Sequence, residues 1–213
     1  MGQRWLFLDV ETTGSTPTRD RVTEVAWVLL DDATGEVTRE SHLVNPDARI
    51  PPFIQQLTGI TDEMVAQAPR FSAVAPKLAE AMAGAVFVAH NARFDYGFIK
   101  NEFKRLGQVV RAPVMCSVKL SRLFFPGEKR HNLDAVMARH SLHADSRHRA
   151  LTDADLIYQF WMALQQQFGK AAVLSAAKSL LTQSSWPSHL DADTLDEMPD
   201  TPGVYIFYGD KRF

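Results

Sequence analysis

Two carboxylates, Asp9 and Glu11, stand at the end of an apolar segment near the start of the chain. Residues 4–10 are typical of a β-strand, and alternate residues of a strand point to the same face, so we expect the two carboxylates to lie side by side. The residues before them are apolar on both faces, which is typical of a central, covered strand. Two neighbouring carboxylates that lose hydration repel each other unless a cation compensates them. The pattern therefore indicates a metal-binding pair, and the structural alternative is a pair of exposed acids on an edge strand.

A third acid, Asp95, follows the short apolar segment 85–89 and the residues His90 and Asn91. The segment is predicted to be a strand, and sites in mixed α/β sheets form at the carboxyl ends of strands. A helix is predicted from about residue 94 to 106, which places Asp95 near its N-terminus. Helix capping alone would also explain an aspartate there.

A fourth acid, Asp153, is predicted in the first turn of a helix over residues 152–168. Thr152 and Asp155 resemble a capping box, and His148 would lie on the loop just before the helix. The alternatives are that Asp153 only complements the helix dipole and that His148 is an ordinary surface residue.

The elements around these residues predict an α/β fold, a mixed sheet with helices packed on it. Three strands come first, and alternating helices and strands follow, which is the pattern expected of such a sheet. Pro46 and the pair Pro51-Pro52 interrupt the pattern after the third strand. The expected strands are residues 4–10, 22–31, 36–44, 85–89 and 113–117, and the expected helices are residues 72–83, 94–106, 118–125, 132–140, 152–168 and 171–181.

Length and composition fit one full domain with an appendage. The chain has 213 residues, of which 46% are hydrophobic and 23% charged, as in ordinary globular proteins. No apolar run approaches the roughly 20 residues of a membrane-spanning helix, and the start lacks the pattern of a signal peptide. The single cysteine, Cys116, excludes an intrachain disulfide and a cysteine zinc cluster. We therefore expect a cytoplasmic protein without a membrane partner.

The net charge of −2 is unevenly distributed. Residues 93–149 contain 12 Lys and Arg against 5 Asp and Glu, a balance of +7, so the rest of the chain carries −9. A cation-rich half beside an acid-rich half suits a protein that binds phosphates and also holds metal. Scattered charge on a solvated surface is the alternative.

Taken together, the acidic segments resemble the three motifs of the DEDD exonuclease superfamily. The motifs are Asp9-x-Glu11-Thr12-Thr13-Gly14, His90-Asn91-x-x-Phe94-Asp95 and His148-x-Ala150-x-x-Asp153. The resemblance spans residues 5–168 and includes the family-like segments 57–61 and 120–127. It is to the His-containing branch, which includes the proofreading ε subunit of bacterial DNA polymerase III. The other branch has Tyr four residues before the last Asp, where this chain has Arg149. The resemblance implies an RNase H-like fold, and no catalytic position is missing.

The resemblance also implies the role of each acid. Asp9, Glu11 and Asp153 would hold one metal ion, and Asp9 and Asp95 a second. Carboxylate oxygens select Mg²⁺ or Mn²⁺. His148 would act as the general base for the attacking water. The product would be a nucleoside 5′-monophosphate. The residues implied to line the pocket for the terminal nucleotide are Thr12, Thr13, Leu57, Thr58, His90, Asn91 and Phe94.

The implied function is metal-dependent 3′–5′ exonucleolytic removal of nucleotides from single-stranded DNA or a DNA 3′ end, in proofreading or repair. A DNA polymerase or a repair protein is the implied partner. One alternative is an RNA-trimming exonuclease of the same superfamily, since the motifs do not reveal the pocket that accepts or rejects a 2′-hydroxyl. The other is a catalytically idle module that binds DNA ends, which the complete set of acids and His148 argues against.

The composition changes after residue 168. Residues 184–200 carry five acids and no Lys or Arg, which is typical of a linker. Residues 202–208 resemble the opening strand of a GIY-YIG endonuclease domain, without the rest of that domain's motifs. The predicted organisation is an exonuclease domain (1–170), a helix and acidic linker (171–200), and the truncated start of a possible GIY-YIG domain (201–213). No residue beyond about 180 is expected to be needed for the exonuclease chemistry.

Overall fold

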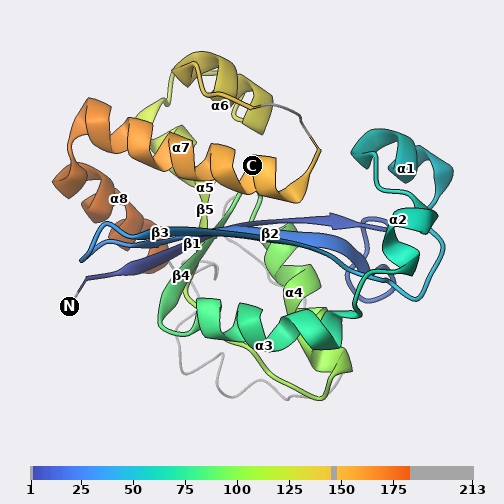
Figure 1. The fold of residues 1–213 in the computed structure, drawn as a ribbon. Helices are drawn as coiled ribbons and strands as arrows, with labels where there is room; N and C mark the ends of the chain where they lie inside the picture. The colour runs from blue at the N-terminus through green and yellow to red at the C-terminus, as the bar shows by residue number, and fades with distance from the viewer. Residues whose placement is uncertain (1, 145–147, 183–213) are drawn as a thin grey trace, which may run out of the picture. The chain divides into compact units, whose positions relative to one another are not determined.

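The computed structural model describes residues 2–144 and 148–182. Its centre is a five-stranded mixed sheet in the order β3-β2-β1-β4-β5 (Figure 1). The first three strands are antiparallel, and β4 and β5 run parallel to β1, which confirms the predicted α/β fold class. The strands are β1 Arg4–Thr12, β2 Val22–Asp31, β3 Val37–Leu43, β4 Ala85–Ala89 and β5 Val114–Cys116.

Strand β1 is the central strand and is covered on both faces, as its apolar sequence predicts. Trp5 and Phe7 point to one face, where their rings lie 4.4 and 6.0 Å from that of Trp161. Leu6 and Leu8 point to the other face and belong to the second half of the core. Asp9 and Glu11 continue the row of Trp5 and Phe7, because residues two apart share a face.

Two layers of helices sandwich the sheet (Figure 1). One layer contains α3 and α4, and the other contains α5 to α8. The helices of the first layer are α3 Phe71–Met82 and α4 Arg93–Arg105. Those of the second are α5 Ser117–Phe124, α6 Leu133–His140, α7 Ala150–Phe168 and α8 Lys170–Thr182. Each predicted helix agrees with an observed one within two residues at either end.

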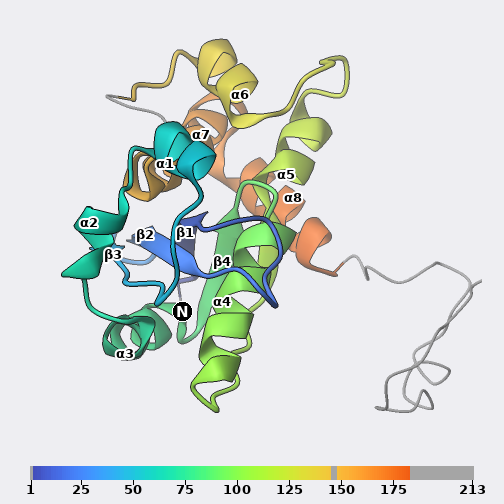
Figure 2. The ribbon, with the colours of Figure 1, turned by 90° about the vertical axis from the view of Figure 1, so that its right-hand side faces the viewer.

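Two short helices, α1 Pro52–Thr58 and α2 Asp62–Ala66, were not predicted. The pair Pro51-Pro52 predicts an interruption of regular structure, but Pro52 occupies the first turn of α1, where a missing N–H costs nothing. The two helices enclose a small core of Ile50, Ile60 and Val65. They lie beyond the end of the sheet at which β1 finishes, and Figure 2 shows the molecule from that end.

Residues Met1–Leu181 form one compact unit. Helix α8 buries Val173 and Ala177 against the core of this unit. The predicted linker and the predicted strand of residues 202–208 lie outside the described residues. No helix of the described residues has the length and apolar character needed to cross a membrane.

Candidate active site

Three of the predicted acids meet at the carboxyl end of β1. Asp9 and Glu11 leave the same face of β1, and Asp153 reaches them from the first turn of α7. One carboxylate oxygen of each residue lies within 4.8 Å of the others. Three carboxylates this close repel one another strongly unless a cation lies between them, and hard oxygen donors are what Mg²⁺ and Mn²⁺ prefer. The donor set therefore fits a divalent metal ion.

Asp95 is buried beside this group, in the first turn of α4, and is 2% exposed. Strand β4 pairs with β1 as far as Phe7, and beyond that point the Val10 N–H donates to Asp95 Oδ1 at 3.3 Å. Burial is the main cause that raises the pKa of Asp95 to about 8, and the charges of Glu11 and Asp153 act in the same direction. Asp95 is thus coupled electrostatically to the three acids, although it is not part of the group that lies within 4.8 Å.

The start of α7 differs from the prediction. The capping box of Thr152 and Asp155 is wrong: the helix begins at Ala150, with Arg149 at the N-cap and no side-chain cap of its own. The carboxylate of Glu24 on β2 takes that place, because it accepts a hydrogen bond of 3.0 Å from the Ala150 N–H. Asp153 lies in the first turn, as predicted.

Glu24 also binds the side chain of Arg149. Arg149 donates from Nε at 3.0 Å and from Nη2 at 2.8 Å, and Ser41 Oγ donates to the same carboxylate at 3.1 Å. Glu24 is 1% exposed and stands opposite Glu11 in the β1–β2 register. The hydrogen bonds to Glu24 raise the pKa of Arg149, and the charge of Glu11 adds to this. An ion pair between the buried Glu24 and the partly exposed Arg149 thus joins β2 to the end of α7 that carries Asp153.

His148 lies on the bend immediately before this ion pair, as predicted, and is half-buried. Its φ of 61° is in the left-handed region, which is uncommon for residues other than glycine. Strained backbone of this kind occurs often at functional sites, because the surrounding contacts must hold it in place.

A second buried carboxylate, Glu102 of α4, holds the loop between β1 and β2. Arg21 donates to it from Nε at 2.8 Å and from Nη2 at 3.0 Å, and the Val22 N–H donates at 3.3 Å. Arg105 adds a hydrogen bond of 3.2 Å. Sequence reasoning missed both Glu24 and Glu102. The available signal was that Glu24 stands among apolar residues of the predicted strand 22–31, and that Glu102 lies three and four residues after Ile99 and Phe98, on the apolar side of the predicted helix 94–106.

Thr12 and Thr13, predicted to line the nucleotide pocket, shape the loop that follows β1. The Thr12 hydroxyl donates to the Gly14 carbonyl at 2.6 Å, and the Thr13 hydroxyl accepts from the Arg21 N–H at 3.0 Å. A Cβ at Gly14 would lie 2.5 Å from a carboxylate oxygen of Asp20, so a side chain there would displace the carboxylate that accepts a hydrogen bond from the Thr16 N–H at 2.7 Å.

The predicted residues of α1 differ in their surroundings. Thr58 is 4% exposed, and its hydroxyl donates to the Ile54 carbonyl at 3.0 Å and accepts from the Ile60 N–H at 3.1 Å. Leu57 is 52% exposed, and Phe53, one turn earlier, is 67% exposed. The apolar surface of α1 that a ligand can reach is therefore that of Leu57 and Phe53.

The predicted residues between β4 and α4 lie at the same end of the sheet. His90 Nδ1 is 2.8 Å from the hydroxyl of Ser117, the first residue of α5. Asn91 is exposed and has a φ of 67°, which turns the chain from β4 into α4. Phe94 is half-buried, with its ring centroid 4.9 Å from that of Phe98.

Comparison with protein families decides the affiliation of the chain. The family model described as Exonuclease (RNase_T) matches residues 6–160, which include all four acids and His148. This chain belongs to the exonuclease family. Asp9, Glu11, Asp95 and Asp153 of the exonuclease, and both buried glutamates, lie within the matched part, whereas α8 lies outside it.

Known relatives of the exonuclease are longer proteins. The 3′-5′ exonuclease DinG of Bacillus subtilis is 41% identical over 157 residues, which is 72% of this chain and 17% of DinG. A putative bifunctional exonuclease/endonuclease protein of Mycobacterium tuberculosis is 34% identical over 217 residues, 96% of this chain and 33% of that protein. The exonuclease therefore spans a third or less of the length of these two relatives.

A solved structure supports the fold of the exonuclease. Exonuclease X, in complex with 5′ overhanging duplex DNA, superimposes with a TM-score of 0.66 at 26% identity and covers 83% of this chain and 99% of that one. The likeness confirms the RNase H-like fold that the motifs implied.

Proposed function

We propose that this exonuclease removes nucleoside 5′-monophosphates one at a time from the 3′ end of DNA, with divalent metal ions as cofactors. The observation that carries the proposal is the meeting of Asp9, Glu11 and Asp153 within 4.8 Å, with Asp95 buried beside them. The names of DinG and of exonuclease X in its DNA complex support the direction of attack and the choice of DNA over RNA.

Each acid of the site has a role in this proposal. Asp9, Glu11 and Asp153 would hold one ion, and Asp9 and Asp95 would hold the second, with Mg²⁺ or Mn²⁺ preferred by the all-carboxylate donor set. Two bound ions supply Lewis-acid stabilisation of the attacking and leaving oxygens of an in-line displacement. Because bound cations favour the charged form of Asp95, its carboxylate is ionised when the site is loaded.

His148 takes a proton from the attacking water at a ring nitrogen, because a neutral imidazole nitrogen accepts a proton and His148 lies five residues before Asp153 in the sequence. The Glu24–Arg149 pair fixes the backbone on which His148 lies. Thr12, Leu57, His90 and Phe94 surround the terminal nucleotide. We assign the activity to proofreading or repair, beside a DNA polymerase or a repair protein.

The test uses 5′-labelled single-stranded DNA, a 3′-mismatched duplex and RNA of the same sequence. We expect a ladder of shortened, labelled products and free nucleoside monophosphates with Mg²⁺ or Mn²⁺, none with chelator, and a preference for DNA. Asp153→Asn, purified identically, controls for contaminating nuclease. Metal binding is measured separately, as a rise in melting temperature on addition of Mn²⁺ that Asp9→Ala removes. Release of the 5′ label before shortening, or activity in chelator, would refute the proposal.

We also infer that the segment 201–213 is the start of an endonuclease domain of GIY-YIG type, so that the exonuclease is one part of a bifunctional nuclease. The supporting observation is that the alignment with the bifunctional mycobacterial relative covers 96% of the chain and so extends beyond α8. An antibody against the exonuclease domain tests this in extracts of the source cells. A band well above 23.9 kDa supports the inference, and a single band at that mass contradicts it.

A further inference from the structure

Four exposed cations lie on α5 and on the loop that connects it to α6. Lys119 and Arg122 lie three residues apart on α5 and therefore on the same side of the helix. Lys129 and Arg130 lie in the loop between α5 and α6, and all four residues are exposed. Among the described residues, no ion pair includes any of the four. We call these four residues the α5 track.

The α5 track starts beside the acidic cluster. Ser117, the first residue of α5, is 1% exposed, and its hydroxyl lies 2.8 Å from His90 Nδ1. His90 follows β4, which runs parallel to β1, the strand of Asp9 and Glu11. Eight residues of helix span about 12 Å, which corresponds to roughly three or four nucleotides at the 3.4 Å per nucleotide of a stacked strand with duplex geometry. The α5 track therefore runs away from the site over the length of a few nucleotides.

The backbone of the loop is held in place although its cations are exposed. Arg139 of α6 donates to the Arg130 carbonyl at 2.7 Å and to the Ser121 hydroxyl at 3.2 Å. The same hydroxyl is 2.8 Å from His131 Nδ1. A charged surface whose backbone is already ordered loses less conformational entropy when it binds.

The structure concentrates the positive charge predicted for this part of the chain. Two of its acids, Asp95 and Glu102, are buried, and Glu128 pairs with Arg139 at 3.4 Å. The exposed residues of the described part of this segment (93–144) include nine Lys and Arg: Arg93, Lys100, Lys104, Arg105, Arg111, Lys119, Arg122, Lys129 and Arg130.

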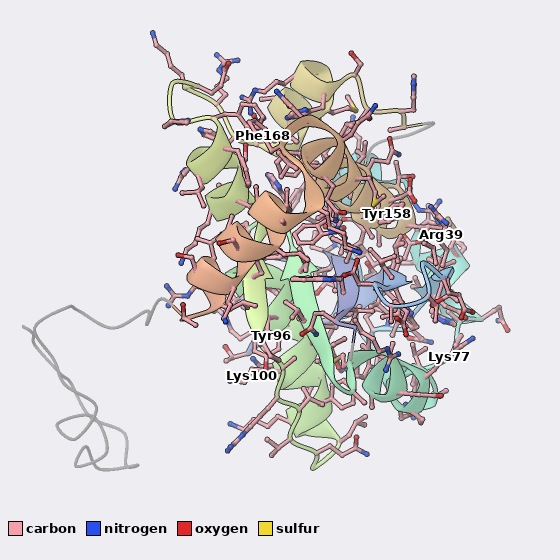
Figure 3. All side chains as sticks on the ribbon, turned by 90° about the vertical axis from the view of Figure 1, so that its left-hand side faces the viewer. Arg39, Lys77, Tyr96, Lys100, Tyr158 and Phe168 are labelled. Carbon is pink, nitrogen blue, oxygen red and sulfur yellow. The ribbon has the colours of Figure 1, made fainter. Side chains whose placement is uncertain are left out.

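Two exposed cations on another part of the surface form ion pairs with acids. Lys77 pairs with Glu40 at 2.7 Å, and Arg70 pairs with Asp47 at 3.0 Å. Figure 3 shows Lys77 on one side of the molecule and Lys100 on the other. Because Lys77 and Arg70 are already neutralised by acids, they form a matched control for the track.

We propose that the α5 track binds the phosphates of the nucleic-acid strand upstream of the 3′ end. The inference rests on the proposed function for the position of that end. Lysine and arginine side chains bind phosphates without regard to base sequence, so the track contributes affinity and position but no sequence preference.

Binding of a labelled single strand, measured by fluorescence anisotropy in chelator over a series of salt concentrations, tests the track without any catalysis. The variant Lys119→Gln/Arg122→Gln is compared with Arg70→Gln/Lys77→Gln, which removes the same two charges. For each phosphate of a single strand that the variant no longer neutralises, the slope of log affinity against log salt should decrease by about 0.7. This corresponds to about fivefold weaker binding per phosphate at about 0.1 M salt. The control should retain the wild-type slope.

Kinetics with substrates of different length then test how far from the 3′ end the track binds the strand. Turnover of a dinucleotide, which is too short to extend along α5, should be unchanged in the track variant and shows that its active site is folded. KM for strands longer than about four nucleotides should rise. The same salt slope in the track variant and the control would overturn the inference. Wild-type protein that binds DNA through the track but degrades no nucleic acid would refute the proposed function alone.

Discussion

The Glu24–Arg149 pair leads to a sharp prediction. In Arg149→Met, the Glu24 carboxylate still accepts hydrogen bonds from the Ala150 N–H and the Ser41 hydroxyl. It loses the two charge-assisted hydrogen bonds of 3.0 and 2.8 Å from the guanidinium. Methionine retains most of the side chain's apolar contacts. The change therefore isolates the loss of the guanidinium.

The size of the effect follows from burial. Removing one partner of a buried ion pair costs about 3–5 kcal/mol of stability, because the other charge remains buried. The side chain of Glu24 is 2% exposed but that of Arg149 is 39% exposed, so water partly replaces the guanidinium. We therefore expect about 2–3 kcal/mol, or a fall in melting temperature of about 5–10 °C for a chain of this size. In Glu24→Gln/Arg149→Met, which leaves no unpaired charge, we expect most of this loss to be recovered.

The chain offers a matched control on the same helix. Arg39 of β3 pairs with Asp155 of α7 at 2.8 Å, but the two side chains are 46% and 26% exposed. Figure 3 shows Arg39 beside Tyr158, where its guanidinium carbon lies 5.4 Å from the centre of the ring. Exposed pairs contribute about 1 kcal/mol or less, so Arg39→Met should destabilise far less than Arg149→Met.

Catalysis provides a second readout, at a temperature at which the variant is folded. A shift of about 1 Å in a catalytic group can lower the rate about 100-fold. Loss of the pair should therefore reduce kcat of Arg149→Met more than it raises KM. Arg149→Lys should recover part of the rate, since lysine keeps the charge but not the bidentate geometry. Equal stability and equal kcat in Arg149→Met and Arg39→Met would refute the reasoning.

Four further predictions concern the site and the tail. His148→Ala should lose about 10²–10⁴-fold in rate but keep the stabilisation by Mn²⁺, and near-normal turnover would require another base. Asp9→Ala should be no less stable than wild type in chelator, because it relieves repulsion, and a clear fall in melting temperature would contradict this. The raised pKa of Asp95 means that the contribution of this one group to folding stability without metal is fully present below pH about 4 and is lost as the pH rises to about 8, so the difference in stability between wild type and Asp95→Asn in urea denaturation should change over this range. Truncation after Leu181 should leave exonuclease rate and melting temperature unchanged, and a large loss of either would place the tail within the working domain.

Patterns among residues that are close in the sequence were sufficient to predict much of the fold and two of the four acids of the site. The apolar run of residues 5–8 predicts a central strand because only a strand covered on both faces tolerates it, and β1 is that strand. The two-residue period of a strand places Asp9 and Glu11 on one face without further information. The helix of residues 71–82 follows from periodicity alone, since its apolar positions recur every three or four residues.

Local rules failed where the partner is distant in the sequence. The start of α7 was misassigned because its cap is Glu24, 126 residues away, and a capping rule considers only neighbouring residues. The sequence does not predict α1 and α2, because a proline pair is found both at the start of a helix and in a segment without regular structure. The small core of Ile50, Ile60 and Val65 favours the helices here.

The sequence by itself determined which residue types the chain has for chemistry, and which face of β1 two of them occupy. Only the tertiary structure decided that Asp153 joins Asp9 and Glu11 while Asp95 is buried next to them, and that three arginines neutralise Glu24 and Glu102. The physical reason is that the charge and pKa of a carboxylate depend on burial and on neighbours a few ångströms away. Strand pairing and helix packing bring those neighbours from distant parts of the chain, and no local pattern records them.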